Sequence, residues 1–409
     1  MTTAFNPSTH TITLKDNSTT QYHLRGLRKE NDDIQRWTQF CASVFAYKPS
    51  PPPPEYFARH YYNDPRCDAS LIRVLVHCPD ADNEAQRATG EIVSSVRIFR
   101  RTLSTGSNNG GATIEAGGIG EVCTSPNHQR RGLSKILLKN AIDIMSTSCD
   151  GVGVTSGKDS GGMSCSLLHA NPEFRPVYNK IGGYKSVPSK WSLVPIELGK
   201  LIINATDETN QWMTRQAIFP QDVDILHALH TEYSEKRLIT IMRSKEYWTS
   251  YVSAELGDSL WVLEDDASSI VAWLSIRKRG GRYQLREFGV DRNKPSVSNI
   301  TEFAMKRLLS VALQQIGEDL HADSGKKVSL LLPTFILNDM HQEKMIGATN
   351  EVGSNLGRVN ALFDIDNVVE ENDDGWMYVV FNTSEPNVLD LTMRAEDPVP
   401  HLIWPTDSF

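Results

Sequence analysis

The chain has 409 residues, which is enough for two domains of ordinary size or for one elaborate domain with a large core. Its 42 lysine and arginine residues and 50 aspartate and glutamate residues give a net charge of −8, and this balance argues against nucleic-acid binding, which requires a basic face. The six cysteines lie in the first half and form no C-x-x-C pair, so we expect free thiols, with no disulfide framework and no metal site.

The remaining composition predicts a soluble protein. Residues 1–20 are polar and lack the apolar core of a signal peptide. No run of 18 apolar residues occurs in the chain, so neither a membrane-spanning helix nor a membrane partner is expected. These features together predict a cytoplasmic location.

The first half alternates strand and helix patterns. Helical periodicity predicts helices over 34–45, after the proline run that ends at Pro54, and after Gly132. Apolar and β-branched segments predict strands at 22–27, 70–78, 91–103, 114–124 and 150–156. A short helix and a further strand are expected within 169–187. We therefore predict a mixed α/β domain over residues 20–197.

The helix predicted after Gly132 has a regular apolar period. Its inner stripe consists of Leu133, Ile136, Leu137, Ala141, Ile144 and Met145. Lys135, Lys139 and Asp143 fall off the stripe, so this helix should pack one face against a sheet and expose the other.

The second half is a weaker echo of the first. A hairpin pattern at 259–280 is followed by a strand at 282–290, an amphipathic helix at 299–317 and an apolar strand at 326–335, with a late strand at 376–382. This order of hairpin, strand, helix and strand matches the core of the first half. We predict a degenerate second copy of the same α/β (α+β mixed sheet) unit over residues 205–409.

Residues 127–134 join a predicted strand to a predicted helix, and their composition favours an anion site. The first turn of a helix leaves backbone N–H groups without partners and carries a partial positive charge. Gly132 and Ser134 are small enough to let a diphosphate approach the backbone, while Arg130, Arg131 and Lys135 add charge. The alternative is an ordinary loop whose arginines are solvated.

Two segments resemble the GCN5-related N-acetyltransferases. Gln129-Arg130-Arg131-Gly132-Leu133-Ser134 resembles the Q/R-x-x-G-x-G/A signature of that family, with serine in the last small-residue position. Residues 171–184, NPEFRPVYNKIGGY, resemble the family's N-P-x-x-x-x-x-Y-E-K-L-G-F segment; the extra glycine before Tyr184 is the main departure and leaves the placement of the following strand open.

The resemblance implies an acetyl-CoA site. The strand residues Val122, Cys123 and Thr124 would bind the pantetheine amides through their backbone. The pyrophosphate would be held by the loop residues Gln129, Arg130, Arg131, Gly132, Leu133, Ser134 and Lys135. Asn171 would contact the pantetheine arm; an N-cap before Pro172 is the alternative or additional role.

The resemblance also suggests catalytic residues. Tyr178 matches the family's tyrosine acid, with a packed aromatic as the alternative. Glu121 is a candidate base for deprotonating the amine, and a salt-bridge partner is an equally good reading. The apolar ending HLIWPTDSF resembles that of tandem acetyltransferases of the mycobacterial enhanced-intracellular-survival type, which suggests that the carboxylate of Phe409 is a second candidate base.

The whole chain is similar to the fungal lysine N6-acetyltransferases of lysine catabolism. This similarity implies free L-lysine as the small-molecule amine substrate, with Arg97, Arg286 and Glu287 as candidate contacts for its charged groups. The alternatives are a polyamine, a lysine-like drug or a protein lysine as the acceptor. A non-catalytic acetyl-CoA-binding regulator is a further alternative.

Overall fold

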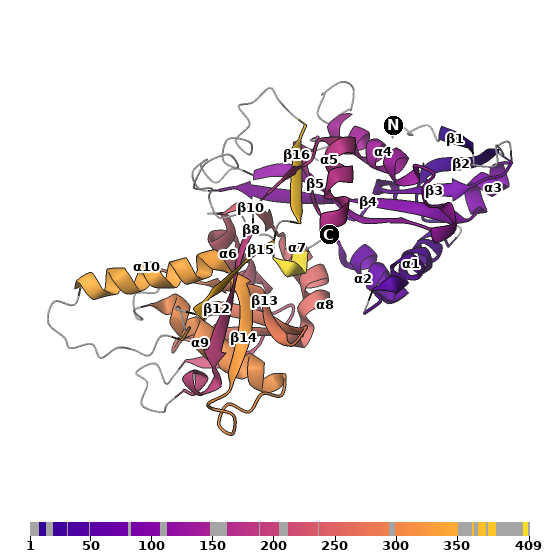
Figure 1. Ribbon diagram of the computed structural model, residues 1–409. Helices are drawn as coiled ribbons and strands as arrows, with labels where there is room; N and C mark the ends of the chain where they lie inside the picture. The colour runs from indigo at the N-terminus through magenta and orange to yellow at the C-terminus, as the bar shows by residue number, and fades with distance from the viewer. Residues whose placement is uncertain are drawn as a thin grey trace.

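The structure is a computed structural model. It describes residues 8–13, 19–30, 32–48, 50–80, 83–106, 113–147, 162–187, 189–203, 212–235, 237–293, 299–350, 362–363, 367–373, 375–381 and 404–407. Within these residues the chain forms two sheets, each flanked by helices (Figure 1). The strand predicted at 150–156 and the residue Phe409 lie outside the described residues.

The first sheet contains the predicted acetyl-CoA strand near its centre. Its order is β1 (Ser8–Thr13), β2 (Thr19–Gly26), β3 (Ile72–His77), β4 (Ile92–Thr105), β5 (Thr113–Thr124), β6 (Cys165–His169), β16 (Trp376–Val380) and β7 (Lys185–Ser186), with β10 (Leu238–Met242) paired to β4. All these pairs are antiparallel except β5 with β6, which are parallel.

Helices cover both faces of this sheet. On one face lie α4 (Leu133–Thr147) and α5 (Arg175–Gly182); on the other lie α1 (Asp33–Val44) and α2 (Pro54–Asn63) (Figure 1). The pleat explains this division, because Leu75 of β3 packs in the cluster with α4 while Val74 and Val76 pack in the cluster with α1 and α2. The short helix α3 (Glu84–Thr89) joins β3 to β4.

The predicted stripe of α4 is confirmed. Of its six members, five are buried and Ile136 is half-buried, whereas Lys135, Lys139 and Asp143 are exposed. The helix therefore rests on β3, β4, β5 and β6, and its first turn lies just beyond the end of β5. This placement brings the motif loop to the edge where β5 leaves its neighbour β6.

The second sheet repeats the core of the first. Its order is β15 (Val369–Asp373), β8 (Ser189–Glu197), β14 (Lys327–Pro333), β13 (Arg282–Val290), β12 (Ile270–Arg279), β11 (Leu260–Glu264) and β9 (Met213–Gln216). The long helix α9 (Ile300–Gln315) connects β13 to β14, and these two strands are parallel, as β5 and β6 are. The predicted echo of hairpin, strand, helix and strand is confirmed by this topology.

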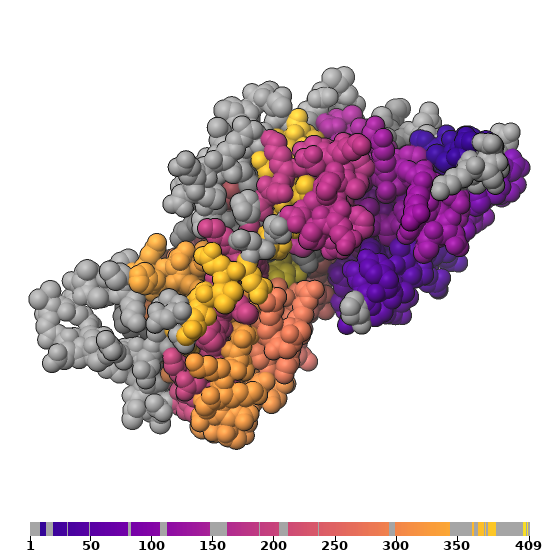
Figure 2. All heavy atoms as spheres, viewed as in Figure 1, coloured from indigo at the N-terminus to yellow at the C-terminus, as the bar shows by residue number. Residues whose placement is uncertain are grey.

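The two sheets exchange strands. The late strand β16 inserts between β6 and β7 of the first sheet, and β8, from the first half of the chain, pairs with β14 of the second sheet. Figure 2 shows the late segments, drawn in yellow, in contact with magenta segments; these contacts correspond to the pairing of β16 with β6 and of β15 with β8. The domain limits 20–197 and 205–409 therefore do not coincide with sheet membership, because the first sheet takes β10 and β16 from across the boundary and the second sheet takes β8.

Further helices of the second half contact the first. The segment α6 (Val223–Glu235) leads to β10, and α7 (Lys245–Tyr247), the π-helical turn η7 (Trp248–Val252) and α8 (Ser253–Leu256) follow it. Residues of α2 pack against η7. The helix α10 (Thr334–Asn350) follows β14. Within the described residues, no helix is both long enough and apolar enough to span a bilayer.

The described part of the C-terminal segment is docked, as its apolar composition predicts. Trp404 is fully buried in the core of the second sheet, and the short 3₁₀ turn η10 (Pro405–Asp407) follows it. Asp407 is buried and accepts hydrogen bonds from Arg243 at 2.7 Å and from the hydroxyl of Tyr247 at 3.2 Å. A buried ion pair therefore fixes the chain two residues before Phe409.

Candidate active site

The loop between β5 and α4 has the geometry of an anion site. Arg130 and Gly132 have positive φ angles of 61° and 76°, and the space beside the Gly132 Cα is open. The amide groups of Leu133, Ser134 and Lys135, in the first turn of α4, donate no hydrogen bond to the described part of the chain. These N–H groups and the helix dipole point to a negatively charged ligand, and the residues present fit the diphosphate of coenzyme A.

The two arginines of the loop differ in role. Arg130 is exposed and available to a ligand. Arg131 instead donates to the Tyr22 hydroxyl at 2.5 Å and to the Asn127 carbonyl at 2.8 Å. His128 also contacts the Tyr22 hydroxyl, through Nδ1 at 3.0 Å. The loop is therefore tied to β2 by side chains, which is not the behaviour of an ordinary loop with two solvated arginines.

The strand β5 separates from β6 just before the loop. The two strands pair only from Ala116 to Ile119 of β5, so the edge of residues 120–124 that faces away from β4 has no strand partner among the described residues. This opened edge contains Val122, Cys123 and Thr124, the residues expected to bind pantetheine. The Cys123 carbonyl accepts from Ser94 Oγ at 3.0 Å, and its thiol lies 3.9 Å from that of Cys41. The five described cysteines, Cys41, Cys67, Cys78, Cys123 and Cys165, are all free.

Asn171 and Tyr178 lie at and within the helical segment that follows β6. Asn171 occupies the N-cap position of the 3₁₀ turn η5 (Pro172–Phe174), but its side chain makes no capping hydrogen bond and is exposed. Its amide is therefore not used by the turn. Tyr178 is half-buried in α5 and packs edge-on against Tyr184, with 6.3 Å between ring centroids. Burial raises the pKa of Tyr178 to about 12, which keeps the phenol protonated at neutral pH.

Glu121 lies at a β-bulge in β5. The pairing of β4 with β5 shifts register between Ser95 and Arg97, and Glu121 takes a positive φ of 53° opposite this shift. Its side chain is 7% exposed, and Arg97 Nη1 approaches a carboxylate oxygen at 3.5 Å. Neither carboxylate oxygen has a hydrogen-bond partner in the described chain. Burial raises the pKa of Glu121 while the charge of Arg97 opposes part of the rise.

The bulge therefore places a buried, unsatisfied acid beside the opened strand. Such a group is expensive to retain unless it serves a ligand, because a buried carboxylate without partners loses the hydration it has in water. Both roles predicted for Glu121, salt-bridge partner and base, are compatible with this geometry. The carboxylate approaches Arg97 at 3.5 Å, a distance that leaves its oxygens able to accept a proton.

The second half of the chain supplies an opposing wall. Glu255 of α8 accepts from Arg59 of α2 at 3.0 Å and from Arg286 of β13 at 2.7 Å, and its carboxylate lies 3.7 Å from the His60 ring. Burial raises the pKa of Glu255, but His60 and the charges of Arg286 and Arg59 outweigh it and hold the pKa below its ordinary value. This cluster joins the two halves, because Arg59 and His60 come from α2 and Glu255 and Arg286 come from the second half.

Aromatic rings line the same interface. The His60 ring lies 4.1 Å from the Tyr56 ring and 5.6 Å from the Tyr251 ring, measured between centroids. Burial raises the pKa of Tyr56 to about 12, and the charges of Glu121 and Glu255 contribute to the rise. Tyr56 therefore lies close to both acids, and the interface combines rings, carboxylates and guanidinium groups.

Arg277 of β12 adds a positive charge at this interface. Its guanidinium bonds the side-chain oxygen of Gln284 at 2.8 Å and forms no ion pair within the described residues. Burial lowers the pKa of Arg277 to about 10, and the nearby charge of Arg286 lowers it further. A guanidinium in this setting would be stabilised by a carboxylate from a ligand.

A deeper network of charges links this interface to the C-terminal segment. Asp64 lies 3.7 Å from Arg97 and 2.8 Å from Arg101, and the Arg101 guanidinium lies over the Tyr247 ring at 5.3 Å. Tyr247 in turn bonds Asp407. Of the three predicted acceptor contacts, Arg97 and Arg286 belong to the interface, whereas Glu287 is fully buried against Arg243 at 2.6 Å.

Sequence reasoning did not find the interface between the two halves. Tyr56, His60, Glu255 and Arg277 follow no local motif, and they meet only because α2 packs against η7 of the second half. The only hint of this interface in the sequence was the group of charged residues in the short helix after Pro54. Such a group is also typical of a helix face that is exposed to solvent.

Comparison with known proteins agrees with the fold. Residues 26–154 match the family model described as the acetyltransferase (GNAT) domain. A protein from Enterococcus faecalis V583, described as a probable N-acyltransferase, superposes with a TM-score of 0.55 and 12% identity, covering 88% of this chain and 73% of that chain. A GCN5-related N-acetyltransferase from Anabaena variabilis ATCC 29413 gives 0.54 and 12%, with coverage of 88% and 73%.

A weaker superposition is found with Eis1 from Mycobacterium abscessus, at a TM-score of 0.48 and 11% identity over 88% of this chain and 74% of that chain. No curated protein sequence matches the chain. The chain thus carries a GNAT acetyltransferase domain within a mixed α/β fold that repeats the unit once. The matched domain is of the acyl-CoA-dependent N-acyltransferase class.

Proposed function

We propose that the protein transfers the acetyl group of acetyl-CoA to the ε-amine of free L-lysine and so forms N6-acetyl-L-lysine. The observation that carries the proposal is the buried Glu121 carboxylate, which lies at the opened end of β5 beside Arg97 and close to Tyr56, a ring that is also influenced by Glu255 of the second half. This reaction is the one implied by the resemblance to the lysine N6-acetyltransferases of lysine catabolism.

The base must act on a group that is protonated in water. A lysine ammonium has a pKa of about 10.4 and must lose a proton before its nitrogen can attack. Burial raises the pKa of Glu121, which makes the carboxylate a better proton acceptor near neutral pH. Glu121 thus fits the role of base through direct contact or one water. The role of the Phe409 carboxylate stays a prediction, since that residue lies outside the described residues.

The acid must serve the leaving thiol. Bound acetyl-CoA supplies an acetyl group activated as a thioester, and the loop before α4 holds its diphosphate. Tyr178 stays protonated because its pKa is about 12, so it is able to donate to the sulfur as negative charge develops there. Asn171, whose amide does not cap its turn, is available to the pantetheine arm.

The opposing wall suits an amino acid. Free lysine carries a carboxylate and an α-ammonium group besides the reacting amine. Arg277, which forms no ion pair in the described chain, is the group we assign to the substrate carboxylate. Glu255 and the rings of Tyr56 and Tyr251 are suited to the α-ammonium group.

A thiol-release assay with chosen acceptors tests the proposal. The panel contains L-lysine, ornithine, spermidine, a lysine-containing peptide, and cadaverine, which is lysine without its carboxylate. We expect selective release with L-lysine and the N6-acetyl product by mass spectrometry. Release with cadaverine or spermidine but not with L-lysine would overturn the assignment, as would no release from any amine despite acetyl-CoA binding.

A matched pair of variants locates the carboxylate contact. We expect Arg277→Gln to raise the KM for L-lysine about 10- to 100-fold, since a hydrogen bond to a charged group contributes about 1.5–3 kcal/mol. The activity of the same variant toward cadaverine should change little. Arg279→Gln, which alters an exposed arginine of the same strand, serves as the control and should leave both KM values near those of the wild type.

A further inference from the structure

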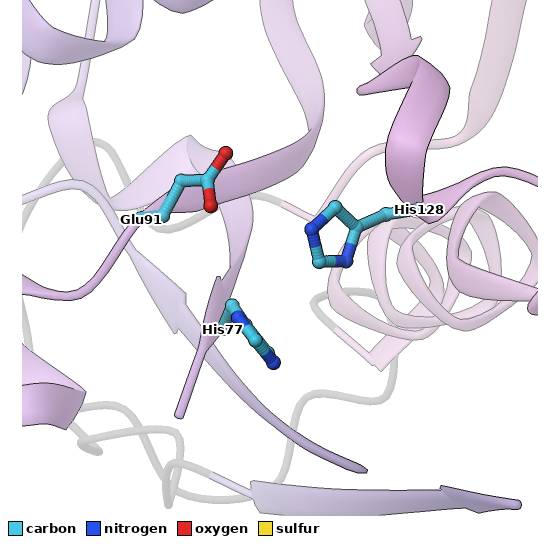
Figure 3. Close-up of side chains that lie close together, drawn as sticks. All are labelled: His77, Glu91 and His128. Atoms are coloured by element: carbon cyan, nitrogen blue, oxygen red, sulfur yellow. The ribbon is translucent and has the colours of Figure 1, made fainter. Parts of the chain in front are cut away.

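Three side chains with metal-ligating atoms converge beneath the loop that precedes α4. His77 is the last residue of β3, Glu91 directly precedes β4, and His128 ends the 3₁₀ turn η4 (Pro126–His128) (Figure 3). One ligand atom from each lies within 4.8 Å of the others. The amide of His77 donates to the Glu91 carbonyl at 2.8 Å, so the β3–β4 pair fixes two of the three positions.

Each histidine has one ring nitrogen held by a hydroxyl group. His77 Nε2 lies 2.8 Å from Thr20 Oγ1, and His128 Nδ1 lies 3.0 Å from the Tyr22 hydroxyl. The other ring nitrogen of each forms no hydrogen bond in the described part of the chain. Figure 3 shows the His128 ring turning one nitrogen toward the Glu91 carboxylate. Metal-binding histidines are oriented in this way, with the second nitrogen bonded to a neighbouring group.

We propose that His77, Glu91 and His128 bind a zinc ion. Two imidazoles and a carboxylate form a donor set that zinc accepts, and three protein ligands leave a fourth position for water. Small shifts of the side chains would bring the ligand atoms to bonding distance, and Glu91 is exposed and free to move. This differs from the expectation of no metal site, because that expectation rested on cysteine spacing, whereas these ligands come from three separate segments.

The surrounding charges make Glu91 the decisive ligand. The guanidinium of Arg131 lies 3.3 Å from His128 Nδ1, on the ring edge that faces Tyr22, and it disfavours a cation nearby. The Glu91 carboxylate offsets this charge. A zinc ion here would connect η4 to the β3–β4 pair and so stiffen the base of the loop that holds the diphosphate. The proposal does not depend on which amine the enzyme acetylates.

Zinc binding to the full chain tests the proposal. Protein freed of metal with a chelator is titrated with Zn²⁺ in competition with a chromophoric chelator, and its melting temperature is recorded with and without Zn²⁺. We expect one equivalent of Zn²⁺ per chain and a higher melting temperature, reversed by the chelator. No binding of Zn²⁺ at equimolar concentration would overturn the proposal.

Variants then locate the ion. Glu91→Gln and His77→Gln should each weaken Zn²⁺ binding by more than about 10-fold, because even the loss of a residue that only hydrogen-bonds a metal ligand costs about 10–100-fold. Glu84→Gln, an exposed carboxylate in the same β3–β4 connection, is the control and should bind Zn²⁺ as the wild type does. Glu91 is exposed, so its variant should fold, and circular dichroism checks this. If both ligand variants bind Zn²⁺ like the wild type, the ion lies elsewhere and the proposal fails.

Discussion

The strands β5 and β13 occupy the same place in the two sheets, yet they present opposite chemistry. Each follows a hairpin partner, contains a bulge and leads toward a long helix. The bulge of β5 carries Glu121, a buried acid whose oxygens have no hydrogen-bond partner among the described residues. The register of β13 shifts at Arg286, whose guanidinium is bound to Glu255. The same backbone irregularity therefore presents an acid in one half and, in the other half, an arginine that is paired with a carboxylate.

The helices after these strands differ in the same sense. The first-turn amides of α4 have no partner in the described chain, whereas those of α9 are occupied by the protein itself. Asn299 Oδ1 accepts from the Glu302 amide at 3.4 Å, and the Glu343 carboxylate accepts from the Thr301 amide at 3.0 Å. An internal carboxylate takes the place that an anionic ligand would need, so α9 has no free anion site of this kind.

A cavity in the second half is also unsuited to an anion such as a diphosphate. It has a volume of about 370 Å³ and lies between β8, α9 and α10, and its lining includes none of the residues of the Glu121 interface. Its lining is mainly apolar, but it includes the carboxylates of Glu302 and Glu370. Those negative charges would repel a diphosphate. One fold unit thus leaves helix amides without a partner in the described chain, while its repeat fills the same place with its own side chains and provides a wall of charged contacts.

The largest expected effect follows from replacing the acid of the first bulge. Glu121→Gln should lower kcat about 10²–10⁴-fold, the range for loss of a general base, with the KM for acetyl-CoA almost unchanged. Burial raises the pKa of Glu121, so wild-type activity should fall as the pH drops through that raised pKa and the carboxylate becomes protonated. The variant should lose this acid limb in a pH–rate profile.

The second sheet offers a control for this variant. Glu287→Gln changes a fully buried acid of β13 that is paired with Arg243, and breaking such a pair costs about 3–5 kcal/mol in the free energy of unfolding. Its folded fraction should keep the wild-type kcat. Equal losses of kcat in the two variants would show that the acids of β5 and β13 do not differ in their effect on catalysis.

Tyr178→Phe should have the next largest effect. The loss of the phenol as acid is expected to lower kcat about 10²-fold, at the low end for general acids because a thiolate is already a good leaving group. Tyr184→Phe is the matched control, since its hydroxyl bonds Ser166 Oγ at 2.8 Å and should affect stability by about 1 kcal/mol. Steady-state kinetics and thermal unfolding separate the two. A Tyr178 variant with wild-type kcat would leave this residue as a packed aromatic.

Gly132→Val tests the loop before α4. A β-branched residue at a φ of 76° costs about 1–3 kcal/mol, which corresponds to about 5- to 150-fold weaker acetyl-CoA binding if the loop must keep this conformation. Gly281→Val places the same strain, at a φ of 80°, in the β12–β13 turn and should leave acetyl-CoA affinity unchanged. Isothermal titration with acetyl-CoA measures both. Similar affinities in the two variants would contradict the loop's role.

The smallest effect is expected at the start of α9. Asn299→Ala removes a side-chain cap and should lower the free energy of unfolding by about 1 kcal/mol, with no change in acetyl-CoA affinity. Denaturant unfolding and the same titration measure the two quantities. A loss of acetyl-CoA affinity here would mean that the second unit takes part in binding the donor.

Local patterns in the sequence were sufficient for most of the core. The 3.6-residue period of α4 fixes which face is buried, and the loop with Gly132 could be recognised because a strand, small residues and a helix start are adjacent in the chain. The repeat was visible for the same reason, since hairpin, strand and helix follow one another in both halves. These features depend on residues that are neighbours in sequence.

Long-range pairing could not be read in this way. The strand β16 has the same apolar pattern wherever it docks, and only tertiary packing decides that it lies beside β6 rather than in the second sheet. Likewise β8 follows β7 closely in sequence but belongs to the other sheet. An apolar period specifies that a strand is buried and leaves its partner open, because many strand edges offer the same backbone hydrogen bonds.

The sequence by itself determined the fold unit, its repetition, the strand-to-helix loop with Gly132 and the candidates Glu121, Asn171 and Tyr178. Only the tertiary structure decided what surrounds them: the loose approach of Arg97 to Glu121, the wall with Glu255 and Arg277, and the grouping of His77, Glu91 and His128. The physical reason is that backbone propensity and periodicity act over a few residues. The charge environment and burial of a side chain are set by segments that meet only after the chain has folded.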